Sequence, residues 1–196
     1  MPTEIIFATN NANKVKEIKA VTGNLLTILS LEEAGILIEI PEPHDTLEAN
    51  ASEKSKVIHQ LTGKNCFSED TGLEVEALNG APGVKSARYA GDTRNFQANI
   101  DLLLNNLEAH ANKKSQFRTV ISLIWNNQEY LFEGICNGQI THQAKGISGF
   151  GYDPVFIPLG ADKTFAEMSM EEKNLYSHRK KAMQALLDFF HQVGVL

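Results

Sequence analysis

Two adjacent carboxylates, Glu69 and Asp70, have the clearest potential for chemistry in this sequence. They lie in an apolar stretch and are followed by Thr71 and Gly72, residues that are typical of turns. We therefore expect residues 66–78 to form a strand, a tight turn and a second strand. Because successive side chains of a strand point to opposite faces, only one of the two carboxylates can easily face a given pocket. That carboxylate could bind a cation or accept a proton, and a purely structural turn is the alternative.

A polar segment near the N-terminus could bind phosphate groups. It follows the apolar run of residues 5–8, which predicts a strand, and precedes apolar residues at helical spacing up to Gly23. The segment consists of Thr9, Asn10, Asn11, Ala12, Asn13 and Lys14. A strand–loop–helix junction directs unpaired backbone N–H groups and the positive end of the helix dipole at one spot. A capped helix start without a ligand is equally compatible with this loop, and the GxxxxGK[ST] phosphate loop is absent.

Glu42 and Lys54 are candidates for binding a metal and its charged substrate. Glu42 lies between two prolines, which stiffen its backbone and suit a metal ligand, although exposed Pro-rich turns are commoner. A helix is predicted from residue 46 to about residue 61, beginning at a capping box formed by Asp45 and Glu48. Lys54 lies on a polar face of this helix, for which a plain solvated surface is the alternative.

Two segments in the second half of the chain could enclose a ligand. Residues 146–154 combine glycines, which allow a ligand to approach the backbone closely, with two aromatic rings, which can stack on a base. Further along, Lys173, His178 and Arg179 could form a cationic wall for an anion or a nucleobase carbonyl. The alternatives are a connecting loop whose aromatics pack on the core and ordinary surface cations.

The remaining patterns predict the elements that position these residues. Further strands are expected at residues 25–29, 36–40, 118–125, 129–140 and 155–157. Residues 96–107 show the spacing of an amphipathic helix, and a capping box of Ser169 and Glu172 begins a C-terminal helix with a break near Ser177. The long hairpin of 118–140 beside strand–helix units indicates a mixed sheet.

Overall composition places limits on the class of protein. The 196 residues, with 42% hydrophobic and 21% charged residues, suit one globular domain, residues 1–196. A net charge of −6 opposes binding to a polyanion such as DNA. We find no signal peptide and no apolar run near the ~20 residues of a membrane span. The two cysteines, Cys66 and Cys136, suit reduced thiols in a cytoplasmic protein.

Taken together and in order, several motifs resemble one enzyme family. TNNANK, a PEP turn followed by LEANASEKS, SEDTGLEVEALNGAPGVKSARYAG, GFGYDPVF and EEKNLYSHR are similar to the inosine triphosphate pyrophosphatase family of house-cleaning nucleotide hydrolases. The resemblance runs from about Ile5 to Phe190. It implies an α/β fold with an elongated central mixed β-sheet flanked by helices, two lobes with an active-site cleft between them, and a homodimer. It also implies Mg2+-dependent hydrolysis of XTP, ITP and dITP to the monophosphate and pyrophosphate.

The resemblance assigns roles by matching position. Asp70 matches the catalytic acidic residue and a metal ligand, and Glu42 resembles an additional metal carboxylate. Residues 9–14 resemble the triphosphate-binding loop, Lys54 matches a lysine near the phosphates, and Thr71 matches a hydroxyl that contacts substrate. The segments that enclose the base correspond to Phe150, Gly151, Tyr152, Asp153, Lys173, His178 and Arg179.

Some positions depart from the usual family pattern, and they are Asn13, Ala49, Glu69, Lys85 and Ser148. Asn13 replaces a common glycine, which is tolerable because Asn enters positive φ readily. Ala49 replaces a glutamate and places any helper role of that carboxylate in doubt. No departure removes a group that the chemistry needs.

The expected mechanism follows from these assignments. Asp70 and Glu42 would hold Mg2+ against the phosphates, and Asp70 or a neighbouring carboxylate would activate the water that attacks the α-phosphorus. Lys14 and Lys54 would neutralise the departing pyrophosphate. Donors from the cationic wall would favour a 6-oxo purine over adenine.

Two other functions are compatible with the same residues. The first is a pyrophosphatase for modified pyrimidine nucleotides. The second is a non-catalytic protein that binds nucleotides or single-stranded nucleic acid through the same aromatics and lysines, the nucleic-acid version being disfavoured by the negative charge.

Overall fold

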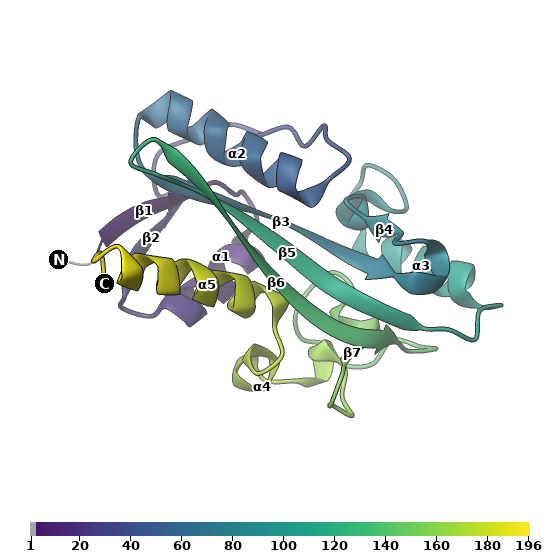
Figure 1. Cartoon of the computed structure of the whole chain (residues 1–196). Coiled ribbons are helices and arrows are strands. Elements are labelled where there is room, and N and C mark those ends of the chain that lie inside the picture. The colour runs from purple at the N-terminus through teal and green to yellow at the C-terminus, as the bar shows by residue number, and fades with distance from the viewer. Residues whose placement is uncertain (1–2) are drawn as a thin grey trace. The chain divides into compact units, whose positions relative to one another are not determined.

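The computed structural model describes residues 3–196, which form a seven-stranded mixed sheet with five α-helices (Figure 1). The strands are β1 (Thr3–Phe7), β2 (Leu26–Ser30), β3 (Cys66–Val75), β4 (Pro82–Gly83), β5 (Lys114–Trp125), β6 (Gln128–Ile140) and β7 (Phe156–Pro158). The helices are α1 (Ala12–Thr22), α2 (Leu47–Thr62), α3 (Phe96–Leu107), α4 (Met170–Asn174) and α5 (His178–Gln192). The strand order is β2-β1-β3-β5-β6-β7, with β4 paired to β3. Strand β1 is parallel to β2 and β3, whereas β4 and β7 are antiparallel to β3 and β6, so the predicted mixed sheet is confirmed.

The chain divides into two compact units. Unit 1 comprises Met1–Asp70, Thr119–Gly134 and Arg179–Leu196, and unit 2 comprises Thr71–Arg118 and Ile135–His178. Strands β3, β5 and β6 contribute residues to both. One boundary falls between Asp70 and Thr71, and another between His178 and Arg179. The adjacent site residues Asp70 and Thr71 therefore belong to different units, and so do His178 and Arg179.

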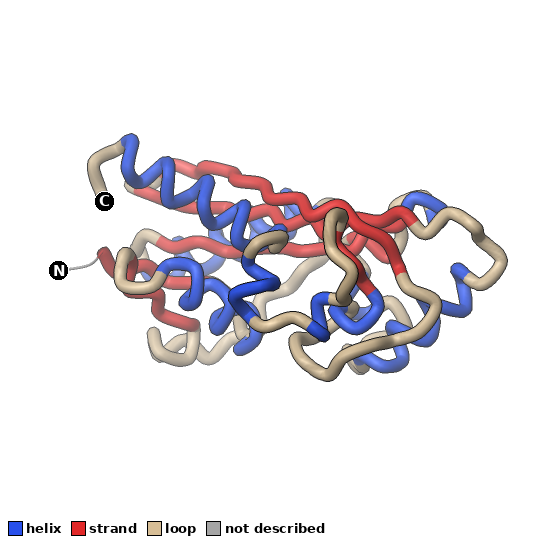
Figure 2. The backbone as a smooth tube through the Cα atoms, turned by 90° about the horizontal axis from the view of Figure 1, so that it is seen from below, coloured by secondary structure: helices blue, strands red, loops and turns tan. Residues whose placement is uncertain are grey.

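In unit 1, helices cover both faces of the sheet. Phe7 of β1 packs with Ile18 of α1 and Met183 of α5 in one apolar cluster, while Ile6 packs with Ile58 of α2 in another. Ile6 and Phe7, which are adjacent in β1, thus point to opposite faces of the sheet, as successive residues of a strand do. Figures 1 and 2 show α5 running alongside the strands. Each fully buried side chain of this size contributes about 1.5–3 kcal/mol to the free energy of unfolding.

Unit 2 has its own apolar core. Leu73 and Val75 of β3 pack with Leu103 of α3 and with Phe117 of β5. The ring of Phe117 lies at the centre of an aromatic group, with its centroid 4.7 Å from that of Phe156. Because α3 presents its apolar stripe to this cluster, the predicted amphipathic helix at residues 96–107 is confirmed.

The predicted turn at Thr71 and Gly72 is wrong, because β3 continues through both residues to Val75. Gly72 is required for a different reason. A Cβ atom built on Gly72 would lie 2.7 Å from the carbonyl oxygen of Gly83, which belongs to the short strand β4. Glycine at this position therefore allows the backbone of β4 to approach β3 closely.

Replacing Gly72 with Ala should lower the free energy of unfolding by about 1–3 kcal/mol, since the new methyl group meets backbone that can yield only by moving β4. Chemical denaturation measures the loss. Gly63→Ala is the comparison, because a Cβ there meets nothing within 4 Å and only the left-handed backbone is strained. A Gly72→Ala protein as stable as wild type would show that β4 can move without cost.

The expected strand at residues 36–40 is also wrong. These residues are irregular, although Ile36 and Ile40 are buried and contribute to the core of unit 1. The backbone N–H of Ile36 donates to the carbonyl of Leu31 in a turn, at 2.8 Å. The burial of Ile36 and Ile40 thus reflects packing of a loop, and the prolines that follow suit an irregular backbone.

The two predicted capping boxes have different outcomes. Helix α2 is capped by the side chain of Thr46, not Asp45, so that prediction is wrong by one residue. The box of Ser169 and Glu172 at the start of α4 is confirmed, with both reciprocal hydrogen bonds present. The predicted break is confirmed too, because α5 begins at His178.

The predicted hairpin of residues 118–140 is confirmed as β5 and β6, with β5 beginning earlier, at Lys114. Asn126 and Asn127 join the strands with φ of 51° and 64°. Positive φ at both positions is what a tight two-residue hairpin loop requires, and Asn adopts it readily.

Both cysteines are buried free thiols, as predicted. Burial raises the pKa of the Cys66 thiol to about 12, so the thiol stays protonated. Among residues 3–196, no helix combines the length and apolar character that crossing a bilayer requires.

Candidate active site

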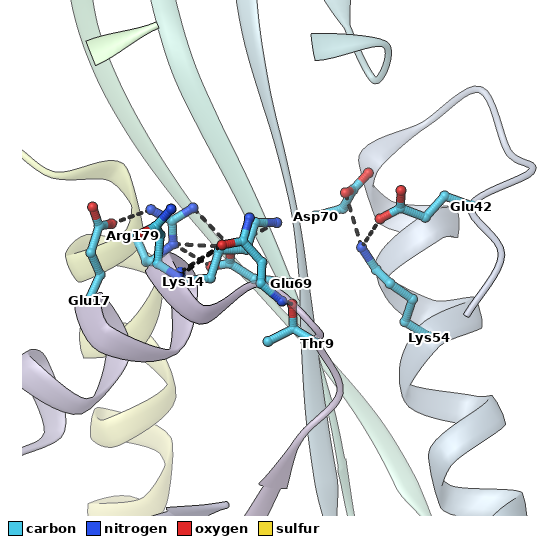
Figure 3. Close-up of polar contacts among 10 residues, drawn as sticks. Thr9, Lys14, Glu17, Glu42, Lys54, Glu69, Asp70 and Arg179 are labelled. Atoms are coloured by element: carbon cyan, nitrogen blue, oxygen red, sulfur yellow. Dashed lines mark hydrogen bonds and ion pairs between the residues drawn. The ribbon is translucent and has the colours of Figure 1, made fainter. Parts of the chain in front are cut away.

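Strand β3 directs Glu69 and Asp70 to opposite sides of the sheet (Figure 3). Glu69 points toward α1 and α5, and Asp70 points toward α2. Both are buried, with 1% and 7% of their surfaces exposed. The alternation expected of adjacent strand residues therefore places the two carboxylates in separate polar clusters of unit 1.

The first cluster contains Asp70, Lys54 and Glu42. The Nζ atom of Lys54 lies 3.1 Å from Oδ1 of Asp70 and 2.7 Å from Oε1 of Glu42. Lys54 comes from α2, and Glu42 comes from the Pro-bounded loop that precedes this helix. The side chain of Glu42 is the most accessible of the three, at 25% exposed. Three residues predicted separately from the sequence thus lie together.

Burial and charge act on this cluster in opposite directions. Burial raises the pKa of the Asp70 carboxyl, and the charges of Lys54 and Lys14 oppose that rise without cancelling it. For Lys54, burial favours the neutral amine, but the carboxylates of Asp70 and Glu42 outweigh it and raise the pKa of the ammonium. Lys54 is therefore a cation, and Asp70 is a better proton acceptor than an ordinary aspartate.

The second cluster contains Glu69, Arg179, Glu17 and Lys14 (Figure 3). The Nε atom of Arg179 donates to both carboxylate oxygens of Glu69, at 3.0 and 2.8 Å, and Nη2 donates to Oε1 at 2.9 Å. Its Nη1 atom donates to Glu17. The Nζ atom of Lys14 lies 3.1 Å from Oε1 of Glu69. The formal charges of these two cations and two anions sum to zero. The cluster is buried, since Arg179 is only 2% exposed.

The charges of this cluster hold one another ionised. Burial favours the neutral form of Glu69, yet the adjacent Arg179 and Lys14 keep its pKa far below the usual range. Burial likewise acts against the charge of Arg179, and Glu69 and Glu17 raise the pKa of its guanidinium. Glu17 has no assigned role in the sequence-based prediction. Its spacing of three residues from Lys14 on one helix is the local signal that could have indicated it.

The predicted phosphate loop forms the start of α1. The side chain of Asn11 caps the helix, accepting from the backbone N–H groups of Asn13 and Lys14 at 3.0 and 3.2 Å. Thr9 in turn accepts from the N–H of Asn11, and Asn10 donates to the carbonyl of Ile38. Asn13 lies within helix α1 and does not adopt the positive φ that replacement of a glycine suggested. The loop is ordered by its own polar groups, and phosphate binding stays a prediction.

In unit 2, Lys173 and Asp153 form a buried ion pair, with Nζ 2.7 Å from Oδ2. The same Asp153 oxygen accepts from the backbone N–H of Phe150 at 2.9 Å. The ammonium also lies 5.5 and 5.2 Å from the ring centres of Phe150 and Phe165, within range of a cation–π interaction. This pair fixes the glycine-rich loop to α4. A Cβ atom on Gly149 would collide with the Asp153 carboxylate.

Two further predicted residues pack inside unit 2. The hydroxyl of Tyr152 donates to the carbonyl of Ser86 at 2.9 Å, and its ring is almost fully buried. The ring of His178 stacks on Phe117, with centroids 4.7 Å apart. Gly151 has a φ of 62°, which favours glycine at that position. The base-binding roles predicted for these residues stay predictions.

Glu42 and Asp70 are the candidate metal ligands of unit 1. Among the described residues 3–196, no group of three or more His, Cys, Asp or Glu side chains could enclose a metal. Asp70 and Glu42, however, both contact the Nζ atom of Lys54 and so converge on one point. Two carboxylate oxygens suit Mg2+, which takes one or two carboxylates and completes its shell with water and substrate phosphates. The residues therefore fit the expected cation.

The fold and this arrangement define an α/β protein with paired acidic and basic groups suited to a phosphorylated substrate. The chain belongs to the Ham1 family, whose model matches residues 5–189. The predicted resemblance is thereby confirmed.

Similar proteins of known name cover almost the whole chain. A dITP/XTP pyrophosphatase of Flavobacterium johnsoniae is 49% identical over 185 residues, covering 94% of this chain and 96% of the relative. One of Porphyromonas gingivalis is 48% identical and covers 95% and 96%. Among solved structures, the Ham1 protein of Staphylococcus aureus has a TM-score of 0.87 at 37% identity, covering 97% of this chain and 99% of that chain. The predicted fold class is thus confirmed.

Proposed function

We propose that this protein hydrolyses the non-canonical purine nucleotides XTP, ITP and dITP to the monophosphate and pyrophosphate, with Mg2+ as cofactor, and so cleanses the nucleotide pool. One observation carries the proposal: the buried Asp70 carboxylate converges with Glu42 on one cationic group. The names and near-complete coverage of the relatives support the same activity.

The residues of the two charged clusters, together with Thr71, would act on the triphosphate. Asp70 and Glu42 would hold Mg2+, which when bound offsets phosphate charge and polarises the phosphoryl oxygens. Asp70, whose pKa is raised by burial, would accept the proton of the water that attacks the α-phosphorus. Lys14 and Lys54 would stabilise the charge that develops on the leaving pyrophosphate. The hydroxyl of Thr71 would position the phosphate chain.

Selection of the base would depend on hydrogen-bond donors. Hypoxanthine and xanthine carry a 6-oxo group, whereas adenine carries an amine. Donors of Lys173, His178 and Arg179 would pair with the oxo group, and the ring of Phe150 would stack on the base. With adenine, donors would oppose donors. Arg179 donates to Glu69 and Glu17, and Lys173 pairs with Asp153, so both cations would contact the base while they keep these carboxylate partners.

A panel of nucleoside triphosphates, assayed for pyrophosphate, tests this function. We expect release from XTP, ITP and dITP with Mg2+, and no release after chelation with EDTA. ATP should be poorer by about 10–100-fold in kcat/KM, because an opposed polar contact costs about 1–3 kcal/mol. Equal turnover of ATP, or release of orthophosphate in place of pyrophosphate, would contradict the proposal.

The same panel separates the alternatives. Preference for modified UTP or TTP over XTP would favour a pyrimidine pyrophosphatase, and nucleotide binding without pyrophosphate release would favour a binding protein. A homodimer and a cytoplasmic location are part of the proposal as well. Sedimentation analysis tests the dimer, and the reduced state of Cys66 and Cys136 supports the location.

A further inference from the structure

Lys54 occupies the point on which the two candidate metal ligands converge (Figure 3). Its Nζ atom lies 2.7 Å from Glu42 and 3.1 Å from Asp70, and its side chain is only 7% exposed. The three groups come from different places in unit 1: a loop, helix α2 and strand β3. One buried ammonium therefore joins both carboxylates of the cation site.

We propose that the ammonium of Lys54 takes the place of the metal in the nucleotide-free protein, where it holds Glu42 and Asp70 together. When a divalent ion binds the two carboxylates, the ammonium moves to the phosphates of the substrate. This inference rests on the proposed function and deepens it. Lys54 would then position the two carboxylates in the nucleotide-free protein and couple metal binding to nucleotide binding.

The first argument is competition for the same oxygens. A divalent ion such as Mg2+ needs carboxylate oxygens at about 2.0–2.1 Å, and Lys54 already hydrogen-bonds these carboxylates. Two cations at one buried site repel each other strongly, because the local dielectric is low. Lys54 must therefore withdraw before both carboxylates can bind the ion. Its flexible four-carbon stem allows the ammonium to move while the helix stays in place.

The second argument is charge balance. Glu42 and Asp70 carry two negative charges, and Lys54 cancels one of them. A free divalent ion thus meets a weakly anionic site in which Lys54 already occupies one oxygen of each carboxylate. A nucleotide triphosphate brings the negative charge that can receive the displaced ammonium. Metal and nucleotide should then bind with positive coupling, and this coupling is reciprocal.

Titration of Mn2+ into nucleotide-free protein, followed by the EPR signal of the free ion, tests the proposal without measuring turnover. Lys54→Gln should bind one Mn2+ at least tenfold more tightly than wild type. Lys54→Met is the second variant, since its apolar side chain suits the buried position if Gln disturbs folding. Circular dichroism checks that both variants are folded. Adding Glu42→Gln to Lys54→Gln should abolish the gain, because one of the two carboxylates is then lost.

Lys56→Gln is the matched control. Lys56 lies on the same helix, is half exposed and pairs with Glu129 at 2.9 Å, outside the cation site. It should bind Mn2+ as wild type does, which separates direct competition from a general change in charge. Equal Mn2+ affinity in wild type and the neutral Lys54 variants, or no binding by any of them, would overturn the inference.

The two proposals fail in distinguishable ways. Pyrophosphate release from XTP by wild type, without tighter Mn2+ binding by the Lys54 variants, would refute the cation exchange alone. Tighter Mn2+ binding by those variants, without pyrophosphate release by wild type, would refute the proposed function and leave a cation site at Glu42 and Asp70.

Discussion

Asp70→Asn is expected to lower kcat for XTP by about 10²–10⁴-fold while the fold stays intact. Asparagine keeps the size of the side chain but loses the negative charge and the capacity to accept a proton. Both losses act on the reacting water, since Asp70 is the proposed base and a proposed metal ligand. Lys54 retains Glu42 as an ionic partner in this variant, so the buried ammonium keeps one carboxylate.

Pyrophosphate release at saturating XTP and Mg2+ measures this effect, and circular dichroism checks the fold. Glu74→Gln is a matched control on the same strand. Glu74 accepts from Gln116 and Arg118 and is not among the proposed site residues, so its kcat should stay within about twofold of wild type. Near-normal turnover by Asp70→Asn would remove Asp70 from the active role.

The sequence predicted the candidate site best where residue type and order were sufficient. The alternation of a strand indicated that Glu69 and Asp70 would diverge, and the structure places them in different clusters. The family resemblance assigned Glu42 and Asp70 to the metal and Lys54 to the phosphates, and Lys54 contacts both carboxylates. The helical spacing of residues 96–107 and the two β-rich runs of the hairpin were also reliable, because they are local properties of the chain.

The incorrect predictions share a physical cause, which is dependence on distant parts of the chain. Gly72 was assigned to a turn, but it is required by the approach of β4. The pairing of Glu69 with Arg179 spans 110 residues, and no local pattern indicates it. Ile36 and Ile40 pack in the core, although residues 36–40 have no strand partner among the described residues. Register, close approach and buried charge pairs are set by tertiary packing.

Arg179→Met is expected to lower the free energy of unfolding by about 3–5 kcal/mol. The substitution leaves the buried carboxylates of Glu69 and Glu17 without the cation that bridges them. Lys19→Met is the matched control, because Lys19 pairs with Glu33 at 2.7 Å where both side chains are more than 40% exposed. Solvent screening limits that exposed pair to about 1 kcal/mol or less. Urea denaturation of both variants measures the difference.

A double variant distinguishes loss of the charge network from loss of packing by the arginine side chain. If Arg179→Met is destabilising because Glu17 is left charged and buried, then Glu17→Gln should cost much less in that background than in wild type. The coupling expected for residues in one ion-pair network is about 0.5–3 kcal/mol. Strictly additive losses would instead assign the effect to packing. Coupling would show that Glu17 and Arg179 act as one network, which also includes Glu69 and its partner Lys14 at the start of α1, where the triphosphate is proposed to bind.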